Sequence, residues 1–168
     1  MREMRRIRQL MSDELNMEVL ARNTNGVLSL AGDEGYPYPV PLSYAYDNGK
    51  IYFHGRTDGY KIDAVKQSEK AAFCVVDADE VDGPGYSTCY RSVIAYGKPR
   101  IVEDADERFR ALQVIGRKYN PEGSEEYLSA FIGKELGEVC VIALDIDFMT
   151  GKEAIEFVRA REENKEQE

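Results

Sequence analysis

The chain has 168 residues, 43% of them apolar, which suffices for one hydrophobic core and argues against two independent ones. The 22 Lys and Arg residues against 31 Asp and Glu residues give a net charge of −9, which disfavours binding to nucleic acid or to an anionic membrane surface. No apolar run is long enough to span a membrane, and residues 1–8 lack the apolar stretch of a signal peptide, so we expect a cytoplasmic protein.

The first part of the chain predicts a helix and then strands joined by tight turns. Ser12 is a suitable N-cap, and the apolar spacing that follows predicts a helix over 12–22. We expect strands over 26–30, 38–46 and 51–53. The glycine-rich segment 32–35 would turn the first strand into the second, and Asn48-Gly49 favours a type I′ turn before the third.

The middle of the chain predicts a short helix and two longer strands. We expect a helix over 60–67 and strands over 71–76 and 90–102, the last bent at Gly97. Residues 77–88 are acidic and contain glycine and proline, a composition typical of an exposed loop.

The last third predicts two helices and an enclosed strand. Asp104 and Glu107 resemble a capping box, and the apolar stripe after them predicts a helix up to Tyr119. A second helix is expected over 124–134. Residues 138–148 have apolar side chains on both faces, as in a strand that is covered on both sides.

Six strands in meander-like order, with helices inserted between them, predict a mainly β fold with added helices. We expect a closed or partly closed antiparallel barrel, because closure removes exposed sheet edges. Residues 1–155 are assigned to this single domain and residues 156–168 to a charged C-terminal tail, which we expect to fray from Arg159 onward.

Few residues could carry catalysis by themselves. There is one histidine, no G-x-S-x-G motif, and Cys74, Cys89 and Cys140 are too widely spaced for a C-x-x-C pair. We therefore predict reduced cysteines, no nucleophilic triad and no metal site. Asp145 and Asp147 share one face of a strand and could form an acid–base pair, but a solvated strand end explains them equally well.

The segment 53–61, Phe-His-Gly-Arg-Thr-Asp-Gly-Tyr-Lys, has the composition of a phosphate cradle. It leaves a strand and enters a helix, and Gly55 and Gly59 would let a ligand approach the backbone closely. The possible donors to phosphate oxygens are Arg56, Thr57 and Lys61. An ordinary glycine-containing turn has the same composition, and His54 alone could be a structural histidine, so both interpretations stay open.

A second candidate is the strand segment 90–97, Tyr-Arg-Ser-Val-Ile-Ala-Tyr-Gly. Alternation places Ser92 on one face and Arg91 on the other, so the strand could present Ser92 to a ligand. An ordinary amphipathic strand gives the same pattern. The 11 tyrosines concentrate around 36–60 and 86–96, where they could line a flavin-sized slot, a barrel core or a dimer interface.

Six motifs follow one another along roughly residues 4–155. They are Pro37-Tyr-Pro-Val-Pro-Leu-Ser-Tyr44, the Asn-Gly hairpin, Ile51-Tyr-Phe-His-Gly55, Gly59-Tyr-Lys61, Tyr90-Arg-Ser-Val-Ile94 with Gly97, and Thr150-Gly-Lys152. Their order and spacing resemble the pyridoxamine 5′-phosphate oxidase-like split-barrel flavoproteins, in the nitroimidazole-resistance (Nim-type) branch. The resemblance implies a six-stranded antiparallel split β-barrel, a homodimer, and FMN bound at the dimer interface.

The resemblance also implies which residues bind the phosphate of FMN. Lys61 matches the phosphate-binding lysine of the family, and Gly55, Arg56 and Thr57 occupy the neighbouring loop positions. These assignments fall on the segment that has the composition of a phosphate cradle.

For the flavin ring, the resemblance implies contacts from two strands and from a second chain. Val40, Pro41 and Leu42 match the strand whose backbone lies along the isoalloxazine. His54 matches a strand-end histidine beside the flavin and is the candidate catalytic residue. Ser92 matches a polar residue that contacts FMN from across the dimer interface.

Two departures from the family narrow the function. Tyr60 stands where many relatives have histidine, and residues 159–163 lack the histidine of the substrate motif of pyridoxamine 5′-phosphate oxidases proper, which disfavours vitamin B6 oxidation. We expect an FMN-dependent oxidoreductase acting on a small molecule, with nitroimidazoles and other nitro compounds as candidate substrates. The alternative is a non-catalytic module that binds flavin or haem, with His54 as the haem ligand.

Overall fold

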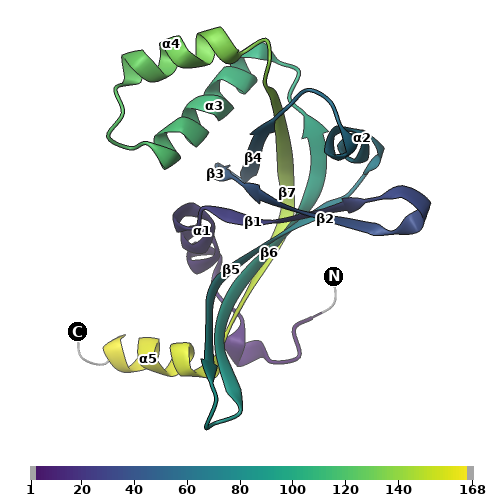
Figure 1. Ribbon diagram of the computed structural model, residues 1–168. Helices are drawn as coiled ribbons and strands as arrows, with labels where there is room; N and C mark the ends of the chain where they lie inside the picture. The colour runs from purple at the N-terminus through teal and green to yellow at the C-terminus, as the bar shows by residue number, and fades with distance from the viewer. Residues whose placement is uncertain (1–2, 166–168) are drawn as a thin grey trace.

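The computed structural model describes residues 3–165, so the outermost residues of the predicted domain and tail lie outside the described residues. One antiparallel sheet of seven strands, in the order β2-β1-β5-β6-β7-β4-β3, forms the framework (Figure 1). The strands are β1 (Asn25–Ala31), β2 (Pro37–Ser43), β3 (Ala45–Asp47), β4 (Lys50–Gly55), β5 (Ala71–Asp82), β6 (Ser87–Ile101) and β7 (Cys140–Glu153). The helices are α1 (Asp13–Arg22), α2 (Tyr60–Gln67), α3 (Ala105–Tyr119), α4 (Glu125–Glu135) and α5 (Ile155–Lys165), with short 3-10 helices η1 (Ile7–Gln9) and η2 (Asp33–Gly35).

Short-range signals in the sequence correctly predict where several elements begin and turn. Ser12 and Asp104 cap α1 and α3, because each side chain accepts a hydrogen bond from the backbone N–H three residues later. Asn48 and Gly49 have φ angles of 45° and 78°, as the predicted type I′ turn requires. The mainly β, antiparallel architecture with added helices is confirmed.

The prediction of six strands is wrong by one, because the expected strand 38–46 is broken at Tyr44. Before this residue, β2 pairs with β1 at one edge of the sheet, and after it β3 pairs with β4 at the other edge. Tyr44 is fully buried, and its hydroxyl donates a hydrogen bond to the Leu20 carbonyl at 2.7 Å. The edge strands β2 and β3 do not pair with each other, so the sheet stays open. Only the covalent chain at Tyr44 connects the two edges.

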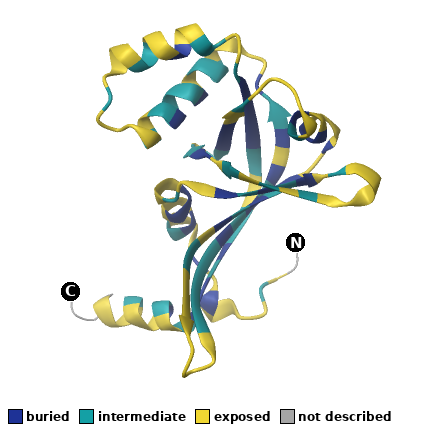
Figure 2. Ribbon diagram, viewed as in Figure 1, coloured by how far each residue is buried: buried dark blue, intermediate teal, exposed yellow. Residues whose placement is uncertain are grey.

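The core lies inside the curved sheet, where dark blue segments gather in Figure 2. Phe53 and Phe73 are fully buried there, and their rings meet edge to face with centroids 5.1 Å apart. A second, smaller apolar cluster lies between the outer face of the sheet and α3. It contains Tyr52 and Val141 from the sheet and Ile115 from the helix.

The prediction of an exposed loop over 77–88 is also wrong. Strand β5 continues to Asp82 and pairs there with Ser87 at the start of β6, so only four residues form the turn. Composition pointed to a loop because these side chains are mostly exposed, but a strand ladder depends on backbone hydrogen bonds and tolerates polar side chains on solvated faces. The hairpin forms a long arm that extends away from the core (Figure 1).

The C-terminal tail does not fray within the described residues, because α5 continues to Lys165. Its Arg161 reaches the fully buried Glu153 of β7 with a separation of 2.5 Å, and Arg91 of β6 pairs with the same carboxylate at 3.1 Å. The Arg91 guanidinium also lies over the ring of Phe157, 4.4 Å from its centroid. These contacts anchor a charged helix that has little apolar surface of its own.

Candidate functional site

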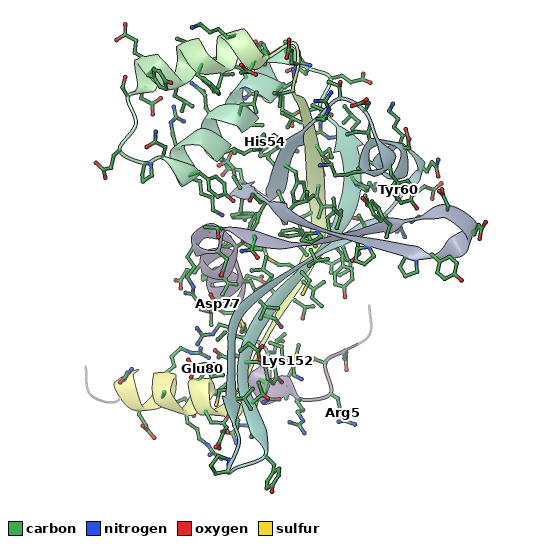
Figure 3. All side chains as sticks on the ribbon, in the orientation of Figure 1. Arg5, His54, Tyr60, Asp77, Glu80 and Lys152 are labelled. Carbon is green, nitrogen blue, oxygen red and sulfur yellow. The ribbon has the colours of Figure 1, made fainter. Side chains whose placement is uncertain are left out.

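Side chains of β4 alternate between the core and an outer pocket. Phe53 points into the core, whereas His54, on the same face as Tyr52, points outward toward α3 and α4 (Figure 3). His54 lines a half-open pocket of about 320 Å³ beneath these helices. The pocket is mostly apolar, lined also by Leu112, Ile115, Gly116, Leu128, Phe131, Ile132, Glu135 and Val139.

The surroundings of His54 favour its neutral form. Partial burial lowers the pKa of its imidazole, and the positive charge of Lys61 lowers this pKa further. A neutral imidazole can donate through one ring nitrogen and accept through the other. His54 can therefore hydrogen-bond to a ligand at the mouth of the pocket, and it carries no charge that would repel a cationic substrate.

Directly after His54, the chain forms the predicted strand–loop–helix cradle. The Lys61 ammonium folds back over Gly55, only 2.9 Å from the point that a β-carbon on residue 55 would occupy. Gly59 adopts φ +106° as the N-cap of α2 and supplies no capping side chain. The Ile62 N–H already donates to the Gly59 carbonyl at 2.9 Å, so the N–H groups of Tyr60 and Lys61 are the ones that remain open. A glycine floor, a cation above it and open N–H groups together fit a phosphate group.

The other two predicted donors of the cradle lie on its outer rim. Arg56 and Thr57 are both exposed, and Arg56 forms a solvent-exposed ion pair with Asp58 at 3.5 Å. Such a pair is weak and exchanges readily with a stronger anion. Arg56 is thus available to a phosphate only through a change of side-chain conformation.

The predicted flavin-ring strand lies at the other edge of the sheet. Val40, Pro41 and Leu42 belong to β2, where Val40 and Leu42 are half-buried against the core and Pro41 is exposed. All three pair with β1. Among the described residues, no further strand lies beside edge strand β2, which leaves its outer side open to a ligand or a partner.

Ser92 is far from His54 within one chain. On β7, His54 pairs with Val141, whereas Ser92 pairs with Lys152, eleven residues further along the same strand. At about 3.3 Å per residue, the two positions are separated by about 36 Å of strand. Figure 3 accordingly shows His54 in the upper part of the molecule and Lys152 in the lower part.

Sequence reasoning missed the helical wall of the pocket. Leu112 and Ile115 were correctly placed on a helix, but their stripe gave no sign of a cavity because a packed helix face has the same pattern. Phe131 is about half exposed, at 51%. Large, partly exposed apolar side chains on a predicted helix are the one signal that points to an unfilled surface.

A scan against protein families matched residues 12–153 to the pyridoxamine 5′-phosphate oxidase family. The chain belongs to this family. The family predicted from the order of the motifs is thus confirmed, and the match includes the cradle, the pocket histidine and the whole arm. A search of curated proteins returned no match.

Solved structures that resemble the chain carry different descriptions. A protein described as a putative 5-nitroimidazole antibiotic resistance protein from Bacteroides thetaiotaomicron has a TM-score of 0.69 at 24% identity, with 85% of each chain covered. An FAD- and haem-binding protein from Mycobacterium smegmatis has a TM-score of 0.72 at 20% identity, with 87% of this chain and 73% of that chain covered. An FAD-binding protein from Mesorhizobium loti has a TM-score of 0.57 at 25% identity, with 86% and 96% covered.

These similarities show that the chain shares the fold of these proteins. Within residues 3–165, no helix is long and apolar enough to span a membrane. The same residues contain no group of three or more His, Cys, Asp or Glu side chains that could hold a metal ion.

Proposed function

We propose that the protein is an FMN-binding oxidoreductase that works as a homodimer. The observation that carries this proposal is the cradle at residues 55–61, where the Lys61 ammonium lies over Gly55 at the open N-terminus of α2. This cradle lies next to the chain's one histidine and its apolar pocket. A site for an anion and a site for a small organic molecule are therefore adjacent.

When bound, FMN supplies redox chemistry, accepting electrons from a donor and passing them to an acceptor. The protein's own residues would bind FMN and orient it. Lys61 and the first N–H groups of α2 would hold the phosphate, and the backbone of residues 40–42 would lie along the isoalloxazine. Neutral His54 would hydrogen-bond to the ring or the substrate, while the apolar wall of the pocket excludes water.

The partner chain enters this proposal through Ser92. Since about 36 Å of strand separates Ser92 from His54 in one chain, both can contact one FMN only if Ser92 comes from a second copy. Lys152 lies beside Ser92 on β7 and would approach the same site. A homodimer with two equivalent sites satisfies this requirement.

The test is the visible absorption spectrum of the purified and dialysed protein, repeated after anaerobic addition of NADH or NADPH. Flavin bands that bleach with a nicotinamide donor support the proposal and lead to a screen of acceptors, with nitroimidazoles first. This choice of acceptor follows the similarity to the nitroimidazole-resistance protein. A colourless protein that takes up neither FMN nor FAD refutes the proposal.

A second candidate function is a non-catalytic module that binds flavin or haem. It is favoured by the similarity to an FAD- and haem-binding protein and by the lowered pKa of His54, which leaves a ring nitrogen free to bind iron. A Soret band in protein reconstituted with haem, lost in His54→Ala, would support it. Reduction of bound flavin by NADH or NADPH would favour the oxidoreductase.

A further inference from the structure

Tyr60, the first residue of α2, directs its side chain toward the hairpin formed by β1 and β2. Its hydroxyl accepts a hydrogen bond from the backbone N–H of Asp33 at 2.8 Å, in the turn between the two strands. A β-carbon on residue 32 would lie only 2.7 Å from this hydroxyl oxygen, so the turn admits the oxygen because Gly32 has no side chain. Figure 3 shows Tyr60 where α2 meets the hairpin.

The ring of Tyr60 makes a second contact with the same hairpin. It packs against the ring of Tyr38, with the ring centroids 4.4 Å apart and the planes inclined by 48°. Tyr38 lies on β2, two residues before Val40, so both side chains lie on the same face of the strand. The Tyr60 side chain therefore contacts both the turn and the strand that leads to residues 40–42.

The other end of α2 is tied to this hairpin as well. Ser68, the C-cap of α2, is buried, and its hydroxyl accepts a hydrogen bond from the Ala31 N–H at 3.0 Å. Ala31 is the last residue of β1, two positions before Asp33. One side chain at each end of the helix thus holds the end of β1, and α2 cannot move relative to the hairpin without breaking one of these hydrogen bonds.

We infer that Tyr60 is a positioning residue, which fixes the distance between the phosphate cradle and the strand that would lie along the flavin ring. This inference rests on the proposed function, in which the cradle holds the phosphate of FMN and residues 40–42 hold its ring. The backbone N–H of Tyr60 is one of the open groups of the cradle, while its side chain holds the hairpin. A site whose two halves are connected before the ligand arrives loses less free energy to ordering when the ligand binds.

The experiment compares the dissociation constants of FMN, riboflavin and inorganic phosphate for the wild type, Tyr60→Phe and the control Tyr38→Phe. Tyr60→Phe keeps the ring contact and removes the hydrogen bond to Asp33. Tyr38→Phe removes a hydroxyl from the same ring pair, but this hydroxyl has no hydrogen-bond partner within residues 3–165.

FMN spans both halves of the site, whereas riboflavin lacks the phosphate and inorganic phosphate lacks the ring. Loss of one hydrogen bond should weaken FMN binding about 3- to 10-fold in Tyr60→Phe. Riboflavin and inorganic phosphate should each bind Tyr60→Phe and the wild type equally. Tyr38→Phe should change none of the three affinities.

The visible circular dichroism of bound FMN supplies a readout that a loss of stability alone does not change. It is recorded at saturating FMN and well below the thermal midpoint of each protein. The spectrum should differ between Tyr60→Phe and the wild type, because the ring is then held differently relative to the phosphate. An identical spectrum would count against the inference.

Two further results would overturn the inference, and a third would refute the proposed function itself. An unchanged ratio of FMN to riboflavin affinity in Tyr60→Phe, even with a lower thermal midpoint, would show a purely structural role. Weaker binding of inorganic phosphate to Tyr60→Phe would mean that the hydroxyl acts on the phosphate itself and does not position the two halves. A wild type that binds no flavin at all instead refutes the proposed function.

Discussion

Asp77 on β5 should contribute a measurable, pH-dependent part of the stability of the fold. Its carboxylate accepts hydrogen bonds from Arg22 and Asn23 at the end of α1 and from Arg91 of β6, at 2.5 to 3.2 Å. Its side chain is only 8% exposed. Asp77 therefore connects α1 to the base of the arm that carries Ser92.

The magnitude follows from the pKa of this carboxyl group. Burial raises the pKa of Asp77, but the hydrogen bonds and charges of Arg22, Asn23 and Arg91 outweigh it and lower the pKa from 3.8 to about 2. At about 1.4 kcal/mol per unit, the shift corresponds to about 2.4 kcal/mol. Because Arg22 is 45% exposed and its charge is screened, we expect about 1.5–2 kcal/mol for Asp77→Asn at pH 7.

The sign of the pH dependence follows from the lowered pKa. The folded state holds the ionised form, so the stabilisation is complete above the unfolded pKa near 4 and declines as the pH falls toward 2. Urea unfolding should therefore show a deficit in Asp77→Asn that is largest at pH 7 and falls to roughly half near pH 3. The matched control is Asp79→Asn, an exposed residue on the same strand. Equal stability of the two variants at pH 7, or a deficit that stays constant down to pH 3, would refute the reasoning.

Two further predictions concern single lysines. Lys61→Met keeps the aliphatic stem but removes the charge over Gly55, so the FMN dissociation constant should rise about 10- to 100-fold, while riboflavin binding measured by fluorescence quenching stays unchanged. Equal losses for both ligands would count against phosphate contact. Burial lowers the pKa of Lys118 to about 8, although its ammonium lies 4.0 Å from the centroid of the Tyr44 ring. The unfolded chain binds this proton more tightly, so the wild type should gain stability as the pH rises from 8 to 10, and this gain should be smaller in Lys118→Met.

Features set by neighbouring residues could be predicted from the sequence. The caps at Ser12 and Asp104 depend on a backbone N–H three residues away, and the Asn48-Gly49 turn depends on the φ angles of two residues. The cradle at 55–61 was predictable for the same reason, because a glycine, a lysine and a helix start lie within seven residues.

Features set by distant contacts could not be predicted in this way. The break at Tyr44 depends on Leu20 and on Tyr119, whose hydroxyl accepts the Tyr44 N–H across 75 positions of sequence. The seven-stranded order follows from this break.

The separation of Ser92 and His54 along β7 gives the proposed dimer its sharpest prediction. If each FMN contacts Lys61 of one chain and Ser92 of the other, a Lys61→Met variant and a Ser92→Trp variant each damage both sites of their own homodimer. In a heterodimer of one Lys61→Met chain and one Ser92→Trp chain, both substitutions fall in the same site. The other site then has an unchanged Lys61 and an unchanged Ser92. Random pairing on co-expression should therefore restore high-affinity FMN binding at about a quarter of all sites.

Neither variant alone should show this fraction of tight sites in an FMN titration. A mixture that binds no better than the separate variants would place Lys61 and Ser92 in the same site of one chain or remove Ser92 from the cofactor. The first alternative conflicts with the register of β7, because Gly55, over which Lys61 lies, pairs with Cys140, whereas Ser92 pairs with Lys152, about 40 Å of strand away. A failed complementation in a protein that still binds FMN would therefore count against Ser92, and the cradle at Lys61 would stand without it.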